Sequence, residues 1–234
     1  HFSDVSDNWN SSGVKDILII NDQDPAIIRD LSQKEAYAGR NFTFKTKPVD
    51  NLNVNEIYVR YQVGEGSIHN SSMELIKTEW ILRIRIPNVL GEMNYIFWAV
   101  DESGRTGSSK ENSVNIKDID PPQLNMESIP SIVASGSDLE ITFNVSDNIE
   151  VSKVFFIYCL GDEAPSNFTL SGADQYRRII KMPEDFIGPL RLLFQAVDTS
   201  GNWNISDLTI EVKDEQPPLL LMRILPLSFR HQIM

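Results

Sequence analysis

The sequence predicts an all-β chain that folds into tandem β-sandwich domains of about seven short strands each. Three observations predict this fold class. The sequence repeats with a period of 96 residues, apolar and polar residues alternate within its apolar segments, and turn-forming residues separate those segments. Because no segment of helical length keeps an apolar stripe on one face, the pattern excludes a helical protein.

The repeat is clearest in three acidic segments that end in proline. Their first prolines, Pro25, Pro121 and Pro217, are 96 residues apart in both cases. Partial copies at both ends lead us to expect an excerpt from a longer array. We predict the end of a preceding repeat at 1–24, full β-sandwiches at 25–120 and 121–217, and the truncated first strand of a following repeat at 218–234.

The strands of the second copy follow from its alternating pattern. In the last of them, Leu208, Ile210 and Val212 alternate with polar residues, so one face of that strand is expected to be buried. In the first copy, residues 64–72, which include His69, are expected to form a loop with no counterpart in the second. The predicted strands of the second copy are 123–127, 138–145, 151–158, 176–182, 189–197 and 206–213, with a weaker one at 167–170.

Composition and charge restrict the possible functions. The 234 residues are 41% apolar, which suffices for folded cores, and the formal net charge of −12 argues against nucleic-acid binding. The single cysteine, Cys159, excludes an internal disulfide, so apolar packing must hold each domain together and the thiol is expected to be inert. No apolar run approaches the roughly 20 residues that span a bilayer.

Two motifs resemble a known group of proteins. The first motif is a strand that ends Ala-Val-Asp-x-Ser-Gly and is followed by Val-Lys-Asp-x-x-Pro-Pro; the second is Asp-Asn-x-x-Val-x-x-Val at 147–154. Both resemble the tandem immunoglobulin-like repeats of bacterial and archaeal cell-surface proteins. This resemblance implies immunoglobulin-like sandwiches that act as extracellular spacers or adhesive stalks. A weaker likeness is to cadherin repeats, through the acidic linker at 21–25 and the late-strand aspartates Asp101 and Asp198, although their Asp-Arg-Glu element is lacking.

Asn-x-Ser/Thr sequons are more frequent than the composition explains. Six are present, whereas the asparagine, serine and threonine content gives roughly 2.4 by chance. Sequons mark surface sites in secreted proteins, so a glycoprotein is predicted; the alternative is that an Asn- and Ser-rich exterior produces them by accident. The candidate asparagines are Asn10, Asn41, Asn70, Asn144, Asn167 and Asn204.

Aspartates are predicted to gather at one end of each sandwich. In the immunoglobulin fold two loops share one end, and the first strand begins there too. Their carboxylates would suit Ca²⁺, which takes six to eight oxygen ligands; alternatively, the same aspartates only cap turns. The candidate ligands are Asp22, Asp24, Asp50 and Asp101 at the start of the first full repeat and, one period later, Asp118, Asp120, Asp147 and Asp198.

The sequence does not predict catalysis. The histidines are His1, His69 and His231, and no Ser-His-Asp or Cys-His arrangement is indicated, so we expect a protein that is not an enzyme. Trp9 and Trp203 occupy equivalent repeat positions; they either stack on a glycan or cover the end of their own sandwich.

These observations lead to one hypothesis with two alternatives. The chain is predicted to be a non-enzymatic extracellular spacer or adhesion segment of a larger cell-surface or secreted protein. Its expected partners are neighbouring repeats of the same chain and a cell-surface protein or glycan, with no nucleic acid and no transmembrane segment. The alternatives are calcium-rigidified, cadherin-like adhesion repeats and a carbohydrate-binding accessory module of a secreted enzyme.

Overall fold

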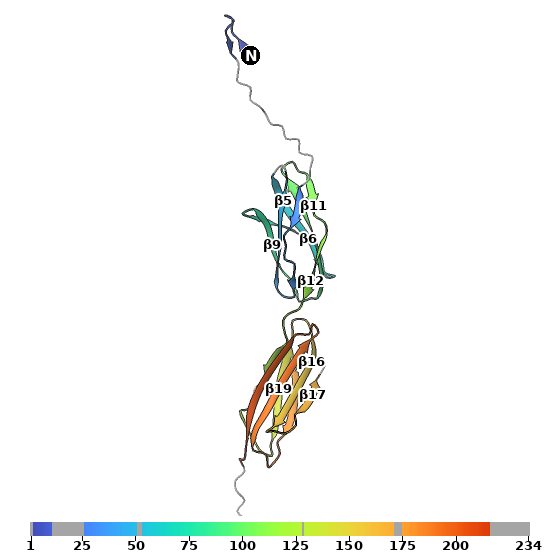
Figure 1. Cartoon of the computed structure of the whole chain (residues 1–234), viewed down its shortest axis with the longest axis vertical. Helices are drawn as coiled ribbons and strands as arrows, with labels where there is room; N and C mark the ends of the chain where they lie inside the picture. The colour runs from blue at the N-terminus through green and yellow to red at the C-terminus, as the bar shows by residue number, and fades with distance from the viewer. Residues whose placement is uncertain (1, 11–25, 51–52, 128, 171–174, 216–234) are drawn as a thin grey trace, which may run out of the picture. The chain divides into compact units, whose positions relative to one another are not determined.

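The computed structural model describes residues 2–10, 26–50, 53–127, 129–170 and 175–215. The regular secondary structure of these residues consists of β-strands, and none of them forms a helix that is long and apolar enough to cross a membrane. The chain divides into two compact units, His1–Lys117 and Asp118–Met234, called the first and the second unit below (Figure 1). The acidic segment 118–120 therefore belongs to the second unit, whereas the repeat pattern assigned it to the first.

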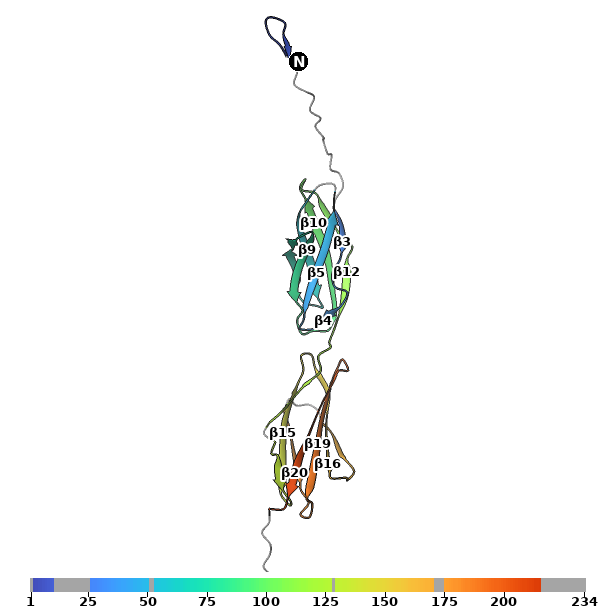
Figure 2. The same ribbon diagram turned by 60° about the vertical axis from the view of Figure 1, so that its left-hand side comes forward.

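Two β-sheets pack face to face in the first unit (Figure 2). One has the strand order β3-β5-β9-β8, and the other has the order β4-β12-β10-β6-β7 with β11 paired to β10. Phe44 of β5 joins the two sheets, because its ring centroid lies 5.0 Å from that of Tyr95 and 6.3 Å from that of Phe97, both on β10. The strands are β3 (Ile27–Asp30), β4 (Ala36–Tyr37), β5 (Asn41–Val49), β6 (Val54–Val63), β7 (Ile68–Ser72), β8 (Glu74–Ile76), β9 (Glu79–Arg85), β10 (Gly91–Asp101), β11 (Thr106–Ser108) and β12 (Asn112–Lys117).

The second unit repeats this architecture. A three-stranded sheet, β13-β15-β18, faces a five-stranded sheet, β14-β20-β19-β16-β17. Phe143 of β15 spans the interface, with its ring centroid 4.9 Å from that of Phe194 and 6.3 Å from that of Phe156. The strands are β13 (Gln123–Met126), β14 (Ile132–Ala134), β15 (Asp138–Ser146), β16 (Val151–Leu160), β17 (Ser166–Leu170), β18 (Gln175–Lys181), β19 (Gly188–Asp198) and β20 (Trp203–Lys213).

Alternation along each strand decides which side chains form the core. On β15, Leu139, Ile141, Phe143 and Val145 are buried and the residues between them are more exposed. Burying one such side chain stabilises the fold by about 1.5–3 kcal/mol. The core that they form with β16, β19 and β20 needs no disulfide, and Cys159 remains a free thiol on β16.

The predicted fold class, tandem immunoglobulin-like β-sandwiches, is confirmed. The topology is immunoglobulin-like because the first part of the second unit supplies β13 to one sheet and β14 to the other. The seven predicted strands of the second copy agree with the observed ones to within three residues at each end. The sequence did not predict β14, whose three residues are too few to show an alternating pattern.

The loop predicted at 64–72 is wrong. Ile68–Ser72 forms β7, which pairs antiparallel with β6 as β17 pairs with β16 in the second unit. This edge strand is exposed on nearly all its residues, so it lacks the apolar alternation that identifies buried strands. His69 lies on it and stacks on Tyr61, with 5.1 Å between the ring centroids.

Each unit also contains one parallel strand pair that joins an early strand to its last strand. In the first unit β4 pairs with β12, and in the second β14 pairs with β20. The pairing continues past the strand ends, because the backbone N–H of Ala38 donates to Lys117 O at 2.9 Å and that of Ser135 donates to Lys213 O at 2.8 Å. Equivalent residues therefore make the same connection in both units.

Candidate metal centre

Three aspartates converge at one end of the second unit. Asp118 precedes β13, Asp147 lies in the turn between β15 and β16, and Asp198 ends β19. One carboxylate oxygen from each lies within 4.8 Å of the others, an arrangement that is able to hold a metal ion. Asp118 and Asp198 are buried, with 7% and 2% of their surface exposed, and Asp147 is half-buried.

Turn chemistry explains the position of Asp147. Its Oδ1 accepts hydrogen bonds from the backbone N–H groups of Ile149, at 2.8 Å, and Glu150, at 3.1 Å. This is the Asx-turn geometry that aspartate favours after a strand. The other oxygen, Oδ2, takes no part in these hydrogen bonds.

A similar turn fixes Asp198. Its Oδ1 accepts from the backbone N–H groups of Ser200 and Asn202, both at 2.8 Å, and its Oδ2 accepts from Asn202 Nδ2 at 2.7 Å. The turn requires a positive φ at Gly201, which adopts +91° and has no Cβ to oppose it.

The N-terminal hairpin repeats this turn. It pairs β1 (Phe2–Ser3) with β2 (Trp9–Asn10), and the carboxylate of Asp4 accepts from the backbone of Ser6 and Asn8 and from Asn8 Nδ2. Residues 4–10, whose sequence is similar to that of 198–204, therefore form a turn with the same hydrogen bonds.

Asp118 joins the segment before β13 to both turns. Its Oδ1 accepts from the backbone N–H of Asp120 at 3.1 Å and from Asn148 Nδ2 at 3.2 Å. Its backbone oxygen accepts from Asn202 Nδ2 at 3.3 Å. Farther along the segment, Asn204 Nδ2 donates to Pro122 O at 2.8 Å. The side-chain amides of Asn202 and Asn204 thus bind the backbone that carries Asp118.

Two oxygens of the cluster are left without a hydrogen bond. The Oδ2 atoms of Asp118 and Asp147 are buried and accept no hydrogen bond in the described structure. The ion pairs among the described residues involve none of the three aspartates. A buried carboxylate oxygen without a partner is costly unless a proton or a cation neutralises it.

The pKa values of Asp147 and Asp198 are shifted in opposite directions. Burial raises the pKa of Asp147, and the nearby carboxylates of Asp118 and Asp198 raise it further. Burial also acts on Asp198, but hydrogen bonds from Asn202 and Ser200 outweigh it and lower the pKa of that carboxyl group. Of these two groups, Asp147 therefore takes up a proton first as pH falls, and Asp198 keeps its negative charge to lower pH.

The donor set suits a hard divalent cation. Three carboxylates provide oxygen ligands of the kind that Ca²⁺ and Mg²⁺ prefer, and the site has no sulfur or imidazole that would select zinc. Ca²⁺ accepts irregular coordination, which is compatible with ligands from three separate loops.

The other predicted ligands lie outside this cluster. Asp120 contributes its backbone N–H, but its carboxylate is not part of the group. In the first unit, Asp101 ends β10 in a turn like that of Asp198, accepting from Ser103 Oγ and from the backbone N–H of Arg105, and Asp50 follows β5. Asp22 and Asp24, which were expected to complete that site, lie outside the described residues.

Sequence reasoning missed the asparagines that organise the centre, which are Asn148, Asn202 and Asn204. A signal for Asn202 was present, because Asn8 stands at the equivalent position after Asp4 and makes the same hydrogen bond. The first unit has Arg105 at that position, which donates only from its backbone.

The sequon asparagines fall into two groups by exposure. Asn41, Asn70 and Asn167 are exposed, whereas Asn144 and Asn204 are half-buried. In the latter two, the amide nitrogen that would carry a glycan donates a hydrogen bond, to Glu127 Oε1 and to Pro122 O, respectively. The side chain of Asn10 lies outside the described residues.

The two tryptophans predicted to be equivalent have exposed rings. Trp9, on β2, is 69% exposed, and Trp203, at the start of β20, is 52% exposed. The Trp203 ring stacks on Phe155 of β16, with 5.9 Å between centroids and 13° between planes. Trp203 thus packs on its own sheet, although half of its surface remains accessible.

Comparisons with known proteins bear on the fold alone. No protein-family model and no curated protein sequence matches the chain. Fibronectin(III)-like modules of Clostridium thermocellum CbhA align at 18% identity over 88% of this chain and 100% of theirs, with a TM-score of 0.33. A tandem pair of titin immunoglobulin domains aligns at 14% identity over 81% of this chain and 97% of theirs, with a TM-score of 0.32.

A third similar structure is a tetra-tandem repeat from the extending region of a large adhesion protein. It aligns at 14% identity over 80% of this chain, with a TM-score of 0.40, and the chain spans about half of its length, 49%. Two of these three similar structures are thus modules of the immunoglobulin and fibronectin type III kinds.

Proposed function

We propose that this chain is a non-enzymatic spacer segment of an extracellular or cell-surface protein, in which the tandem sandwiches bear tension. The observation that carries this proposal is the parallel pair in each unit, β4–β12 and β14–β20. Tension on the two ends of a unit pulls the strands of a parallel pair in opposite directions along their length. Their hydrogen bonds are then loaded together in shear rather than opened one at a time.

Single-molecule force spectroscopy on the full chain tests this function. We expect two unfolding events, each releasing roughly 300 Å of chain. Ser135→Pro removes the backbone donor to Lys213 O, because proline has no N–H, and should lower the unfolding force of the second unit only. Ala38→Pro is the equivalent change in the first unit.

A matched variant separates mechanical from thermal weakening. Phe168→Ala removes packing against Phe156 on β16, away from the β14–β20 pair, and should lower thermal stability with a smaller effect on unfolding force. A spacer role is contradicted if both units unfold without a measurable force peak. It is also contradicted if Phe168→Ala and Ser135→Pro lower the unfolding force of the second unit equally at matched thermal stability.

A second function is favoured by a specific observation. The buried, unpartnered Oδ2 atoms of Asp118 and Asp147, beside Asp198, support binding of one Ca²⁺ ion by the second unit. An ion there would bridge the segment that enters the unit and two of its turns. Because it would bind the folded state only, it would also raise the stability of the unit by mass action.

Calcium titration of the full chain by calorimetry tests this second function. We expect one binding event that Asp147→Asn combined with Asp198→Asn abolishes. The matched control, Asp162→Asn combined with Asp207→Asn, removes the same charge from exposed positions of the same unit and should leave binding unchanged. Equal loss in both double variants would mean that the ion responds to overall charge and not to this site.

A further inference from the structure

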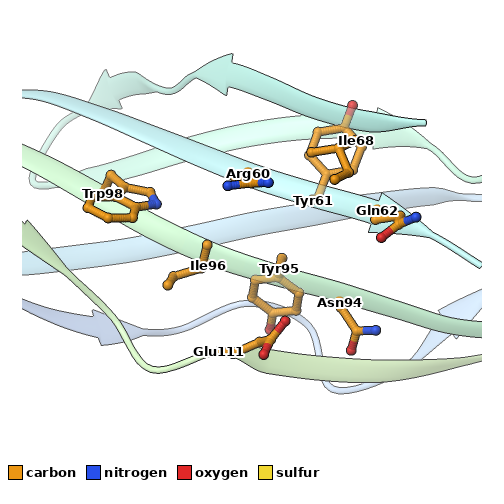
Figure 3. A pocket seen from close by; sticks show the side chains of 9 residues that line it. All are labelled: Arg60, Tyr61, Gln62, Ile68, Asn94, Tyr95, Ile96, Trp98 and Glu111. Atoms are coloured by element: carbon orange, nitrogen blue, oxygen red, sulfur yellow. The ribbon is translucent and has the colours of Figure 1, made fainter. Parts of the chain in front are cut away.

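The outer face of the large sheet in the first unit carries an open groove with unusual chemistry. The groove encloses about 350 Å³ and lies across β6 and β10 (Figure 3). Trp98 and Ile96 form its apolar part along β10, Arg60 lies beside them on β6, and Asn94 and Glu111 add polar groups toward the other end. We propose that this face binds a neutral carbohydrate.

Strand register explains how these side chains come to one face. Directly opposed residues of antiparallel strands point to the same side, and Ile96 is opposite Arg60, while Trp98 is opposite Tyr58. The neighbours of these residues in sequence, such as Phe97 and Val59, point into the core. Trp98 and Asn94 are four residues apart on one strand, so the groove extends about 13 Å along β10.

The polar groups of the groove are available for a ligand. Among the described residues, the side chains of Arg60, Asn94 and Glu111 make no hydrogen bond or ion pair, and neither does the indole of Trp98. Trp98 is 42% exposed. A flat, exposed indole with unpaired donors and acceptors farther along the same groove matches a short saccharide, whose rings have an apolar C–H face and hydroxyl groups at their edges.

The charges favour a neutral ligand. Arg60 and Glu111 carry opposite charges that cancel at the groove, so neither an anionic nor a cationic ligand is selected by net charge. The volume lies at the lower end of the range for small-molecule sites, which favours a short saccharide over a protein surface.

The second unit shows that the fold does not require these residues. At the repeat positions equivalent to Trp98, Arg60 and Asn94 it has Gln195, Ile157 and Arg191, and β16, β19 and β20 pair in the same register. The indole and its polar surroundings are therefore specific to the first unit.

A carbohydrate has two potential sources at this face. Asn70, an exposed sequon asparagine on β7, is directly opposite Arg60, so a glycan attached to it would begin in the same row as Arg60 and Ile96. The other source is a free glycan of another molecule. The ligand chemistry is the same in both cases, and the experiment distinguishes them.

The first arm uses the full chain made without glycosylation. N,N′-diacetylchitobiose, cellotetraose and maltotetraose are titrated while chemical shifts or tryptophan fluorescence are recorded. We expect one of these saccharides to bind, and Trp98→Ala and Asn94→Ala to weaken its binding at least tenfold. Trp203→Ala, which removes a 52% exposed indole from the second unit, serves as the control and should not change the affinity.

The second arm uses the chain from a host that N-glycosylates it. If the Asn70 glycan occupies the groove, it should raise the melting temperature of the first unit and block the free saccharide, and Asn70→Gln or Trp98→Ala should cancel the stabilisation. If the glycan does not block binding, the free saccharide is the ligand. The proposal is overturned if no saccharide binds and Trp98→Ala leaves the effect of the Asn70 glycan unchanged, or if binding survives Trp98→Ala.

Discussion

Replacing Asp118 by asparagine should change the stability of the second unit in opposite directions with and without calcium. Without calcium, the substitution replaces one of three clustered carboxylates by a neutral amide, whose nitrogen is able to donate a hydrogen bond to a neighbouring carboxylate. Oδ1 keeps its hydrogen bonds with Asp120 and Asn148. The substitution therefore removes repulsion and leaves the turn contacts in place.

The size of the effect follows from the spacing of the carboxylates. Two unit charges 4.8 Å apart repel by roughly 3 kcal/mol at an effective dielectric constant of 20. Asp147 is half-buried and screened by solvent, so about 1–2 kcal/mol is a reasonable gain. For a unit of this size, the melting temperature without calcium should rise by roughly 5–10 °C.

Calcium should reverse the order of the two melting temperatures, so that the unaltered second unit melts above the variant. At a free concentration of about 100 times the dissociation constant, an ion stabilises the intact site by about 2.7 kcal/mol, and the variant loses most of that gain because one ligand charge is missing. Differential scanning calorimetry of the full chain, in chelator and in millimolar CaCl₂, measures both effects with the first unit as internal reference. If the variant melts below the unaltered chain in chelator and calcium shifts neither protein, the three aspartates act only as turn caps.

Further expected outcomes concern pH, glycosylation, core packing and the boundary of the second unit. Burial and the neighbouring carboxylates raise the pKa of Asp147, so the calcium-free second unit should lose stability as pH rises from the ordinary carboxyl pKa through the raised one. Calcium affinity should fall on acidification through the same pH range. Thermal melts and calcium titrations over a pH series measure the two effects. The lowered pKa of Asp198 has the opposite pH dependence. Its contribution to stability is present above the ordinary carboxyl pKa and is lost as pH falls through the lowered value. In a glycosylating host, peptide mapping should find glycans at Asn41, Asn70 and Asn167 but not at Asn144 or Asn204, and efficient modification of Asn204 would contradict the hydrogen bond to Pro122. Phe194→Ala should destabilise the second unit by about 3–5 kcal/mol in urea unfolding, because it empties the centre of that core. A fragment 118–217 should fold alone and respond to calcium, whereas 121–217 should fold with the same β-type circular dichroism but without the calcium response, since it lacks Asp118.

The fold could be predicted almost entirely from the sequence because two independent regularities agree. The two-residue alternation locates strands such as β15 and β20, and the repeat brings each strand of one unit into line with a strand of the other. Alternation fails where a strand is not buried on one face. For that reason β7 was predicted as a loop and the three-residue β14 was not predicted.

The site could be predicted only in part, for a different physical reason. Repeat topology indicated which aspartates lie near one end of a sandwich, and Asp118, Asp147 and Asp198 do converge in the structure. Whether a given carboxylate points into the cluster depends on its hydrogen bonds, which the sequence pattern does not reveal. Asp120 shows the difference: it is two residues from Asp118, yet its carboxylate is not part of the group.

The alternatives of turn cap and metal ligand concern different atoms of the same side chain. Asp147 caps its turn through Oδ1, and Asp118 uses Oδ1 for Asp120 and Asn148, so in both residues Oδ2 takes no part in the turn. Capping aims that second oxygen and fixes it, which reduces the entropy cost of assembling a site from three loops. An aspartate that only had to cap a turn would be as stable with its second oxygen in water. The burial of both Oδ2 atoms beside a third carboxylate is what turn formation leaves unexplained, and neutralisation by the proposed cation would account for it.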